Sequence, residues 1–217
     1  MHEFLSDAVL FMPVLLRGLG TTILLTICSL ALSIALGMVW TLIGRSSHAF
    51  LRGISITVIN VVRGIPIIVQ LFCVYFVLPE WGVNLAPFAA GVIGLGIAYS
   101  VYQAENFRGG IDSVDHDLIE AGTALGMSGP TLMRRVILPL GIRTALPSLG
   151  NTTVMLLKDS SIASTITIAE LTREGQLLAI STFKNGTIYL LIALLYLAAS
   201  LPLAAGVRFL ERRIAKR

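Results

Sequence analysis

The sequence predicts an all-α membrane protein with about five transmembrane helices. Hydrophobic residues make up 55% of its 217 residues and charged residues 13%, and the mean hydropathy is +0.85. A soluble domain of this length cannot bury that much apolar surface, so the bilayer must act as its solvent. Apolar stretches of about 20 residues, the length that crosses a bilayer as a helix, recur along the chain.

The expected spans follow from these stretches. They lie at about residues 14–44, 54–78, 86–107, 144–168 and 188–209. The second contains Arg63 and Pro66, which predicts a kinked helix. The fourth must continue through Lys158 and Asp159, because the apolar stretch before them is too short to cross the membrane alone. Residues 1–217 are expected to form a single transmembrane domain.

The distribution of Lys and Arg predicts the orientation. Basic residues gather in the first loop, in the loop at about residues 112–139 with its flanks, and in the C-terminal tail that ends with Lys216 and Arg217. The opposite side begins with the acidic residues Glu3 and Asp7. By the positive-inside rule, the N-terminus lies outside and the C-terminus lies in the cytoplasm. The loop 112–139 is therefore expected in the cytoplasm.

A polar, glycine-broken segment interrupts the apolar pattern within this loop. It reads IEAGTALGMSGPTLMRRVILP from Ile119 to Pro139. Apolar residues at helical spacing up to Leu125 predict a short amphipathic helix, which Gly126 ends. The Ser-Gly-Pro turn at 128–130 then starts a second short helix.

The spacing of this segment resembles the EAA loop of ABC importer permeases, which docks into the ATPase subunit. Glu120-Ala121-Gly122 is followed by Gly126 and by a terminal Leu-Pro, with Gly122 and Val136 in place of the consensus Ala and Ile. The resemblance implies that this loop contacts an ATPase. The implied contact residues are Glu120, Ala121, Gly122, Gly126, Arg134, Arg135 and Pro139. The alternative is an ordinary solvated helical hairpin.

Three further segments resemble the polar amino-acid permeases of the histidine/glutamine type. Residues 63–72, RGIPIIVQLF, are similar to the signature RGTPLLVQLF, with Ile65 in place of the usual Thr. Residues 104–111 and 157–162 are similar to two other segments of that family, in the same order. The resemblance implies a type I ABC importer permease-like fold with short cytoplasmic coupling helices. It also implies a permease subunit that carries polar amino acids or close analogues across the bacterial inner membrane.

The same resemblance implies the partners. Two permease subunits, the same chain or a paralogue, form the pathway in the lipid bilayer. A cytoplasmic ABC ATPase dimer binds ATP and Mg, and an extracytoplasmic binding protein delivers the substrate. The chain has no GxxxxGK[ST] phosphate loop, so the ATPase must be another polypeptide.

No chemistry of its own is expected on this chain. No Ser/His/Asp or Cys/His arrangement is visible, and Cys28 and Cys73 have no metal-ligand spacing. The sequence therefore predicts no catalytic residue, no metal site, no cofactor and no enzyme activity. The basic residues lie next to apolar segments, which favours a topology signal over binding to nucleic acid.

Polar side chains inside the spans are candidates for a substrate pathway, because such groups are costly in a bilayer and usually face a cavity or a partner. They are Asn60, Arg63, Gln70, Gln103, Asn151, Lys158 and Asp159. Asn60, Gln70 and Asn151 are expected to converge on one hydrated cavity.

A structural role is the alternative for these groups. Arg63 is expected to pair with Glu105 or Asp159 if it is structural, and Asn60 to join two helices. The related family often has an acidic residue at the position of Asn60, and this difference argues against a purely cationic substrate.

Two other functional classes fit a membrane chain of this composition. One is a secondary transporter or channel, against which the lack of an inverted repeat argues. The other is a membrane scaffold that does not transport, against which polar groups on three spans argue.

Overall fold

The computed structural model describes the backbone of residues 2–215 and the side chains of residues 4–214. Every regular element in these residues is helical, as predicted. In chain order they are α1 (His2–Gly44), α2 (Ala49–Gly64), α3 (Ile67–Phe72), η1 (Cys73–Val77), η2 (Leu78–Trp81), α4 (Pro87–Asp112), α5 (His116–Ala124), α6 (Gly129–Leu132), η3 (Met133–Ile137), α7 (Leu138–Asp159), η4 (Ser160–Ile166), α8 (Leu171–Thr182) and α9 (Asn185–Ala215). The segments η1 and η3 are π-helical, and η2 and η4 are 3-10 helices.

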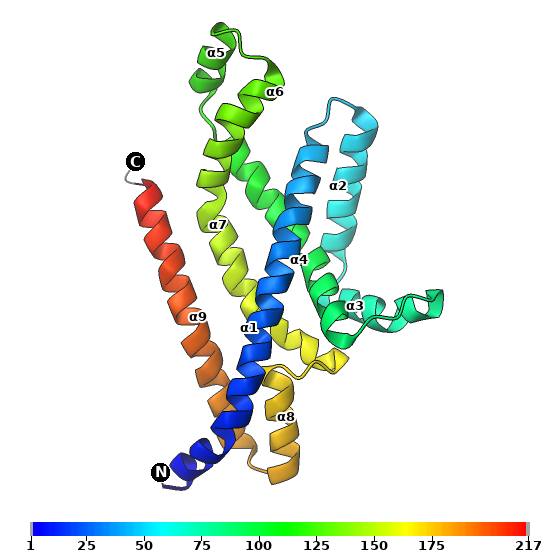
Figure 1. The fold of residues 1–217 in the computed structure, drawn as a ribbon, viewed down its shortest axis with the longest axis vertical. Helices are drawn as coiled ribbons and strands as arrows, with labels where there is room; N and C mark the ends of the chain where they lie inside the picture. Colours follow the sequence, from blue (N-terminus) through cyan, green and yellow to red (C-terminus); the bar gives the residue numbers. More distant parts are fainter. Residues whose placement is uncertain (1, 216–217) are drawn as a thin grey trace.

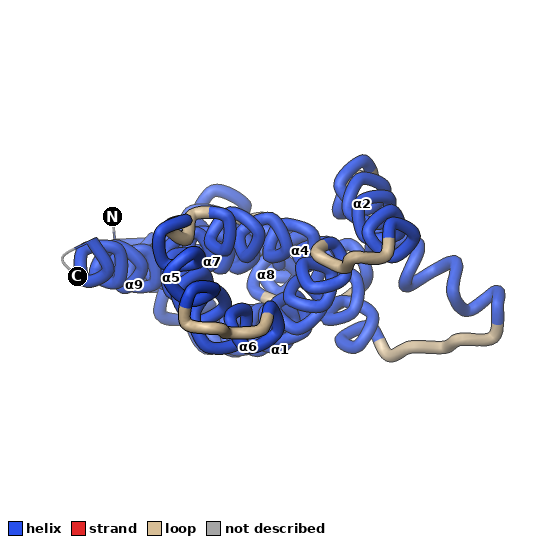
Figure 2. Tube along the Cα trace, turned by 90° about the horizontal axis from the view of Figure 1, so that it is seen from above, coloured by secondary structure: helices blue, strands red, loops and turns tan. Residues whose placement is uncertain are grey.

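Four long helices, α1, α4, α7 and α9, form an elongated bundle (Figure 1). The short helices α5 and α6 lie at one end, and α8 lies at the other. The first residues of α1 lie at the end that carries α8, whereas α9 runs toward the end that carries α5 and α6. Seen from above, the segment after α2 projects sideways from the bundle (Figure 2).

Close approaches between helices place α4 at the centre of the bundle. A Cβ on Gly37 of α1 would lie 2.6 Å from the Cβ of Gln103 on α4. One on Gly110 of α4 would lie 2.3 Å from the carbonyl oxygen of Gly141 on α7. Any larger side chain at these two glycines would push the helices apart. Buried positions consequently follow α4 along most of its length.

Two helices in the described residues are long and apolar enough to cross a membrane by length and composition, α1 and α9. A third span is added if α2 and its bent continuation, residues 67–81, are counted together. The expected spans 86–107 and 144–168 correspond to α4 and α7, which carry more polar side chains such as Gln103 and Asn151. For these two helices, the crossing stays a prediction.

The range 54–78, expected as one kinked span, is two helices that meet at 101°. Ile65, the residue between them, is extended, with φ −101° and ψ 130°. The ring of Pro66 disfavours a helical conformation for the residue before it and removes one backbone N–H. A sharp break therefore replaces the expected kink.

The range 144–168 also differs from a single helix. The helix α7 ends at Asp159, a 3-10 segment follows to Ile166, and Thr167 turns the chain with a φ of 66°. Polar residues from Lys158 to Ser161 coincide with this change, and the hydroxyl of Ser160 donates to the carbonyl of Leu157 at 2.8 Å. The next segment forms a further helix, α8, which was not predicted from the sequence.

A buried carboxylate joins three elements at the α8 end of the molecule. The Glu170 side chain is fully buried and accepts bonds from the backbone N–H groups of Thr172, at 2.9 Å, and Arg173, at 2.7 Å. It also accepts from the hydroxyls of Tyr196 on α9, at 2.8 Å, and Thr22 on α1, at 3.4 Å. Burial raises the pKa of Glu170, while the hydrogen bonds from Thr172, Arg173 and Tyr196 oppose the rise. Glu170 thus caps α8 and holds it to α1 and α9.

Candidate functional site

The loop that the sequence predicts to contact an ATPase begins with α5. Asp115 caps this helix, its carboxylate accepting a bond from the backbone N–H of Asp117 at 3.1 Å. Leu118 and Leu125, seven residues apart and therefore on one face, are 46% and 82% exposed. Leu125 was not among the predicted contact residues, although its place directly before the helix break could have indicated it. An exposed apolar pair of this kind suits a contact with another protein.

Gly126 ends α5 in a left-handed conformation, with φ +75°. Its N–H donates to the carbonyl of Thr123 at 2.9 Å, and the N–H of Met127 donates to that of Gly122 at 3.1 Å. This is the hydrogen-bond pattern of a Schellman motif, which usually requires glycine at the left-handed position. The helix break that the sequence predicts at Gly126 is confirmed.

The second short helix, α6, folds back onto α5. Leu132 is buried, and a Cβ on Gly122 would lie 2.4 Å from its Cδ1 atom. The Leu132 side chain therefore fills the space that the consensus alanine of the related family would use. The hydroxyls of Ser128 and Thr131 lie 2.9 Å apart and close the turn between the helices.

The remaining predicted contact residues are exposed on the same loop. Glu120 and Ala121 lie on α5, and the Glu120 Oε1 atom is 3.1 Å from the His116 Nδ1 atom. Arg134 and Arg135 lie in η3 beside an open crevice of about 400 Å³. Neither arginine has a carboxylate partner in the described residues.

Pro139 is exposed in the first turn of α7. Proline is tolerated there because the N–H groups of the first turn have no partner within a helix. The structure thus gathers all seven predicted contact residues at one end of the bundle (Figure 1).

Among the predicted pathway residues, Arg63 is held by a carboxylate on α4. The Glu105 Oε1 atom lies 3.5 Å from the Arg63 Nη2 atom, and Glu105 also accepts from the Nε atom of Arg108 at 3.0 Å. The Arg63 guanidinium lies 5.9 Å from the centre of the Tyr102 ring. Of the two expected partners, Glu105 is confirmed. Partly exposed pairs of this type contribute about 0–1 kcal/mol to stability.

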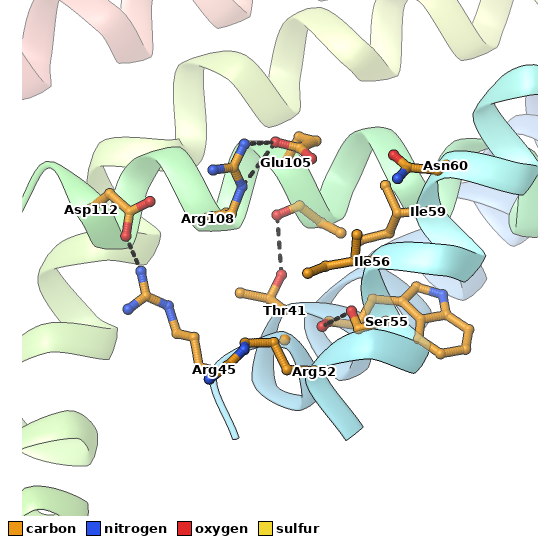
Figure 3. A pocket seen from close by; sticks show the side chains of 13 residues that line it. Thr41, Arg45, Arg52, Ser55, Ile56, Ile59, Asn60, Glu105, Arg108 and Asp112 are labelled. Atoms are coloured by element: carbon orange, nitrogen blue, oxygen red, sulfur yellow. Dashed lines mark hydrogen bonds and ion pairs between the residues drawn. The ribbon is translucent and has the colours of Figure 1, made fainter. Parts of the chain in front are cut away.

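Asn60 lies at one end of a cavity between α1, α2 and α4 (Figure 3). The cavity has a volume of about 390 Å³, and Glu105 of α4 also lines it. Of the seven predicted pathway residues, only Asn60 lines this cavity.

Gln70 closes the break between α2 and α3. Its Nε2 atom donates to the carbonyl oxygens of Val62 and Ile65, each at 2.8 Å. Carbonyls at a helix end have no partner within the helix, so a side-chain donor stabilises them. This arrangement gives the amide of Gln70 a structural role.

Gln103 is fully buried, and its Oε1 atom accepts from the Nδ2 atom of Asn106 at 3.1 Å. The Gln103 Nε2 atom has no hydrogen-bond partner in the described residues. Asn106 also donates to the hydroxyl of Thr152 at 2.8 Å, which links α4 to α7. Asn106 was not among the residues predicted from the sequence.

The other polar candidates have separate surroundings. Asn151 donates to the Glu211 Oε1 atom on α9 at 3.4 Å, and Asp159 accepts from the Tyr99 hydroxyl at 2.6 Å. Lys158 is exposed. The cavity that Asn60 lines is therefore not lined by Gln70 or Asn151, and their convergence stays a prediction. No group of His, Cys, Asp or Glu suited to hold a metal occurs among the described residues.

Comparisons with known proteins agree over most of the chain. Residues 33–216 match the family described as the binding-protein-dependent transport system inner membrane component. The glutamine transport system permease protein GlnP of Escherichia coli (strain K12) is 35% identical over 204 residues, which are 93% of each chain. The probable amino-acid ABC transporter permease protein y4tG of Sinorhizobium fredii (strain NBRC 101917 / NGR234) is 33% identical over 98% of this chain and 92% of its own.

A solved structure has the same fold. It is that of an amino acid ABC transporter with histidines, with a TM-score of 0.91 and 36% identity. The match covers 97% of this chain and 98% of that one.

Proposed function

The chain belongs to the family of binding-protein-dependent transport system inner membrane components, and from this membership we propose that it carries polar amino acids or close analogues as a permease subunit of an ATP-binding-cassette importer. It is a membrane transport subunit and not an enzyme. The observation that carries the proposal is the likeness, along nearly the whole chain, to an amino acid transporter. The exposed loop at about residues 112–139, which contains α5 and α6 and is called the α5–α6 loop below, adds a surface that an ATPase subunit can contact.

The proposed partner at the α5–α6 loop is a dimer of cytoplasmic ABC ATPases, which supplies the ATP and Mg sites. Glu120 and Ala121 on α5, and Leu125 directly after it, are exposed and provide the contact. Gly122 and Gly126 fix the shape of the loop, whereas Arg134, Arg135 and Pro139 flank it. A second permease subunit and an extracytoplasmic binding protein complete the proposed importer.

Replacing Leu125 with glutamate tests this contact. We expect at least a tenfold fall in the amount of ATPase that co-purifies with the chain, because a charge at an apolar contact must be desolvated without a partner. The matched control is Phe183→Glu, since Phe183 is 87% exposed but lies at the opposite end of the bundle. Equal co-purification of the ATPase with both variants would contradict the docking role of the loop.

The proposed orientation places the α5–α6 end in the cytoplasm, on the basis of the Lys and Arg distribution. Glu3, Lys216 and Arg217, which contribute to that distribution, lie outside the residues whose side chains are described. A reporter active only in the cytoplasm should work when fused after Arg217 and fail when fused before Met1. The opposite pattern would remove the loop from the side on which an ATPase acts.

Asn60 is the proposed pathway residue that the cavity supports best. We expect Asn60→Leu to change substrate preference or to lower uptake about tenfold, because an unmade hydrogen bond in a polar site costs about 1–3 kcal/mol. If Asn60 contacts substrate, the yield of the assembled importer complex should stay normal in Asn60→Leu and Asn60→Asp. A loss of assembly in both would instead indicate a contact between helices, and parental uptake with parental selectivity would exclude both roles.

A further inference from the structure

The end of the cavity away from Asn60 has features that transport of an amino acid does not explain. The cavity opens between the ends of α1, α2 and α4, at the end of the molecule that carries the α5–α6 loop (Figures 1 and 3). Three arginines, Arg45, Arg52 and Arg108, line it together with the carboxylates of Glu105 and Asp112.

Two of these arginines are already paired. Arg45 donates to Asp112, and Arg108 donates to Glu105 (Figure 3). The exposed side chain of Arg52 has no ion pair or hydrogen bond in the described residues. The lining therefore carries three guanidinium groups and two carboxylates, and Glu105 also pairs with Arg63 outside the lining. Positive charge exceeds negative charge here, and Arg52 is the lining arginine without a carboxylate partner.

The wall beside Arg52 is apolar. Trp40 of α1 and Ile56 and Ile59 of α2 line this wall, and Ile56 is 53% exposed. A small soluble anion has no need of an apolar wall, whereas the acyl chains of a lipid require one.

We propose that this cavity binds the headgroup of an anionic phospholipid, with Arg52 contacting the phosphodiester. A phosphodiester carries a negative charge that the unpaired guanidinium of Arg52 can contact, and the apolar wall beside it accommodates the acyl chains. A basic pocket between membrane helices suits such a ligand, and the proposed cytoplasmic orientation of the α5–α6 end would place this pocket at the headgroups. The carboxylate of Asp112 can also accept a bond from a headgroup hydroxyl, which favours a glycerol headgroup over choline.

Native mass spectrometry of the purified full-length permease tests the site, with phosphatidylglycerol as the probe and phosphatidylcholine of the same acyl chains as its comparison. We expect phosphatidylglycerol to bind more tightly, and Arg52→Gln to weaken its binding about fivefold, as expected for one basic residue near an anionic headgroup. The matched control is Arg212→Gln, which removes the same charge from the exposed last turn of α9, outside this cavity. This control should bind phosphatidylglycerol like the parent.

A second variant changes the shape of the cavity and leaves its charge unaltered. Ile56→Trp should also weaken phosphatidylglycerol binding, because the indole fills the space beside the apolar wall. Equal binding of both lipids, or unchanged binding in either Arg52→Gln or Ile56→Trp, would overturn the proposal. Displacement of phosphatidylglycerol by millimolar inorganic phosphate would assign the site to a soluble anion instead, and would overturn the lipid assignment.

Discussion

Replacing Gly126 with leucine is expected to lower ATP-driven uptake at least tenfold while the chain still inserts into the membrane. The Gly126 backbone has a φ of +75°, and its surroundings are open, so the penalty comes from conformation and not from a steric contact. A side chain in this conformation costs about 1–2 kcal/mol. The α5–α6 loop would then lose the conformation in which Leu125 is exposed for contact. Coupling to the ATPase would be lost as a result.

The matched control for this variant is Gly109→Leu. Gly109 also has open space around it and lies in the last turns of α4, but its φ is not positive. The comparison therefore separates backbone conformation from added side-chain bulk at the same end of the molecule. The measurements are uptake into proteoliposomes and the amount of co-purified ATPase. Parental values of both in Gly126→Leu would contradict a coupling role for the helix break.

Replacing Glu170 with alanine is expected to cause the largest loss of stability. It removes the acceptor of two backbone N–H groups at the start of α8 and of the Tyr196 and Thr22 hydroxyls. Each buried donor left without a partner costs about 1–3 kcal/mol, and loss of the cap is part of that cost. A total of about 3 kcal/mol corresponds to a fall of roughly 6–12 °C in the unfolding midpoint for a chain of this size.

Thermal unfolding of the purified permease measures this effect. The unfolding midpoint of Glu170→Gln should lie between those of the parent and the alanine variant. The glutamine amide keeps one acceptor oxygen, but its NH₂ group faces the remaining donors. Glu174→Ala, one turn further along α8, is the control, since the Glu174 side chain has no ion pair or hydrogen bond in the described residues. A midpoint for Glu170→Ala equal to that of Glu174→Ala would show that the buried carboxylate does not hold α1, α8 and α9 together.

Local features of the sequence determined the class of the protein and the shape of its loop. Hydropathy and composition indicated an all-α membrane chain, because both depend on residues that are adjacent in sequence. The end of α5 at Gly126 followed from the same local chemistry, since only glycine adopts a positive φ without a penalty. The motif spacing then indicated the family, which the comparisons bear out.

Contacts between helices were decided only by the tertiary structure. The sequence offered Glu105 and Asp159 equally as partners of Arg63, and gave no sign that Gln70 caps α2 or that Asn151 meets Glu211. It also gave no sign that Glu170 is buried. Which polar groups meet depends on how each helix is rotated and how closely it approaches its neighbours. Packing at glycines such as Gly37 and Gly110 sets both, and the residues that face each other there are far apart in the sequence.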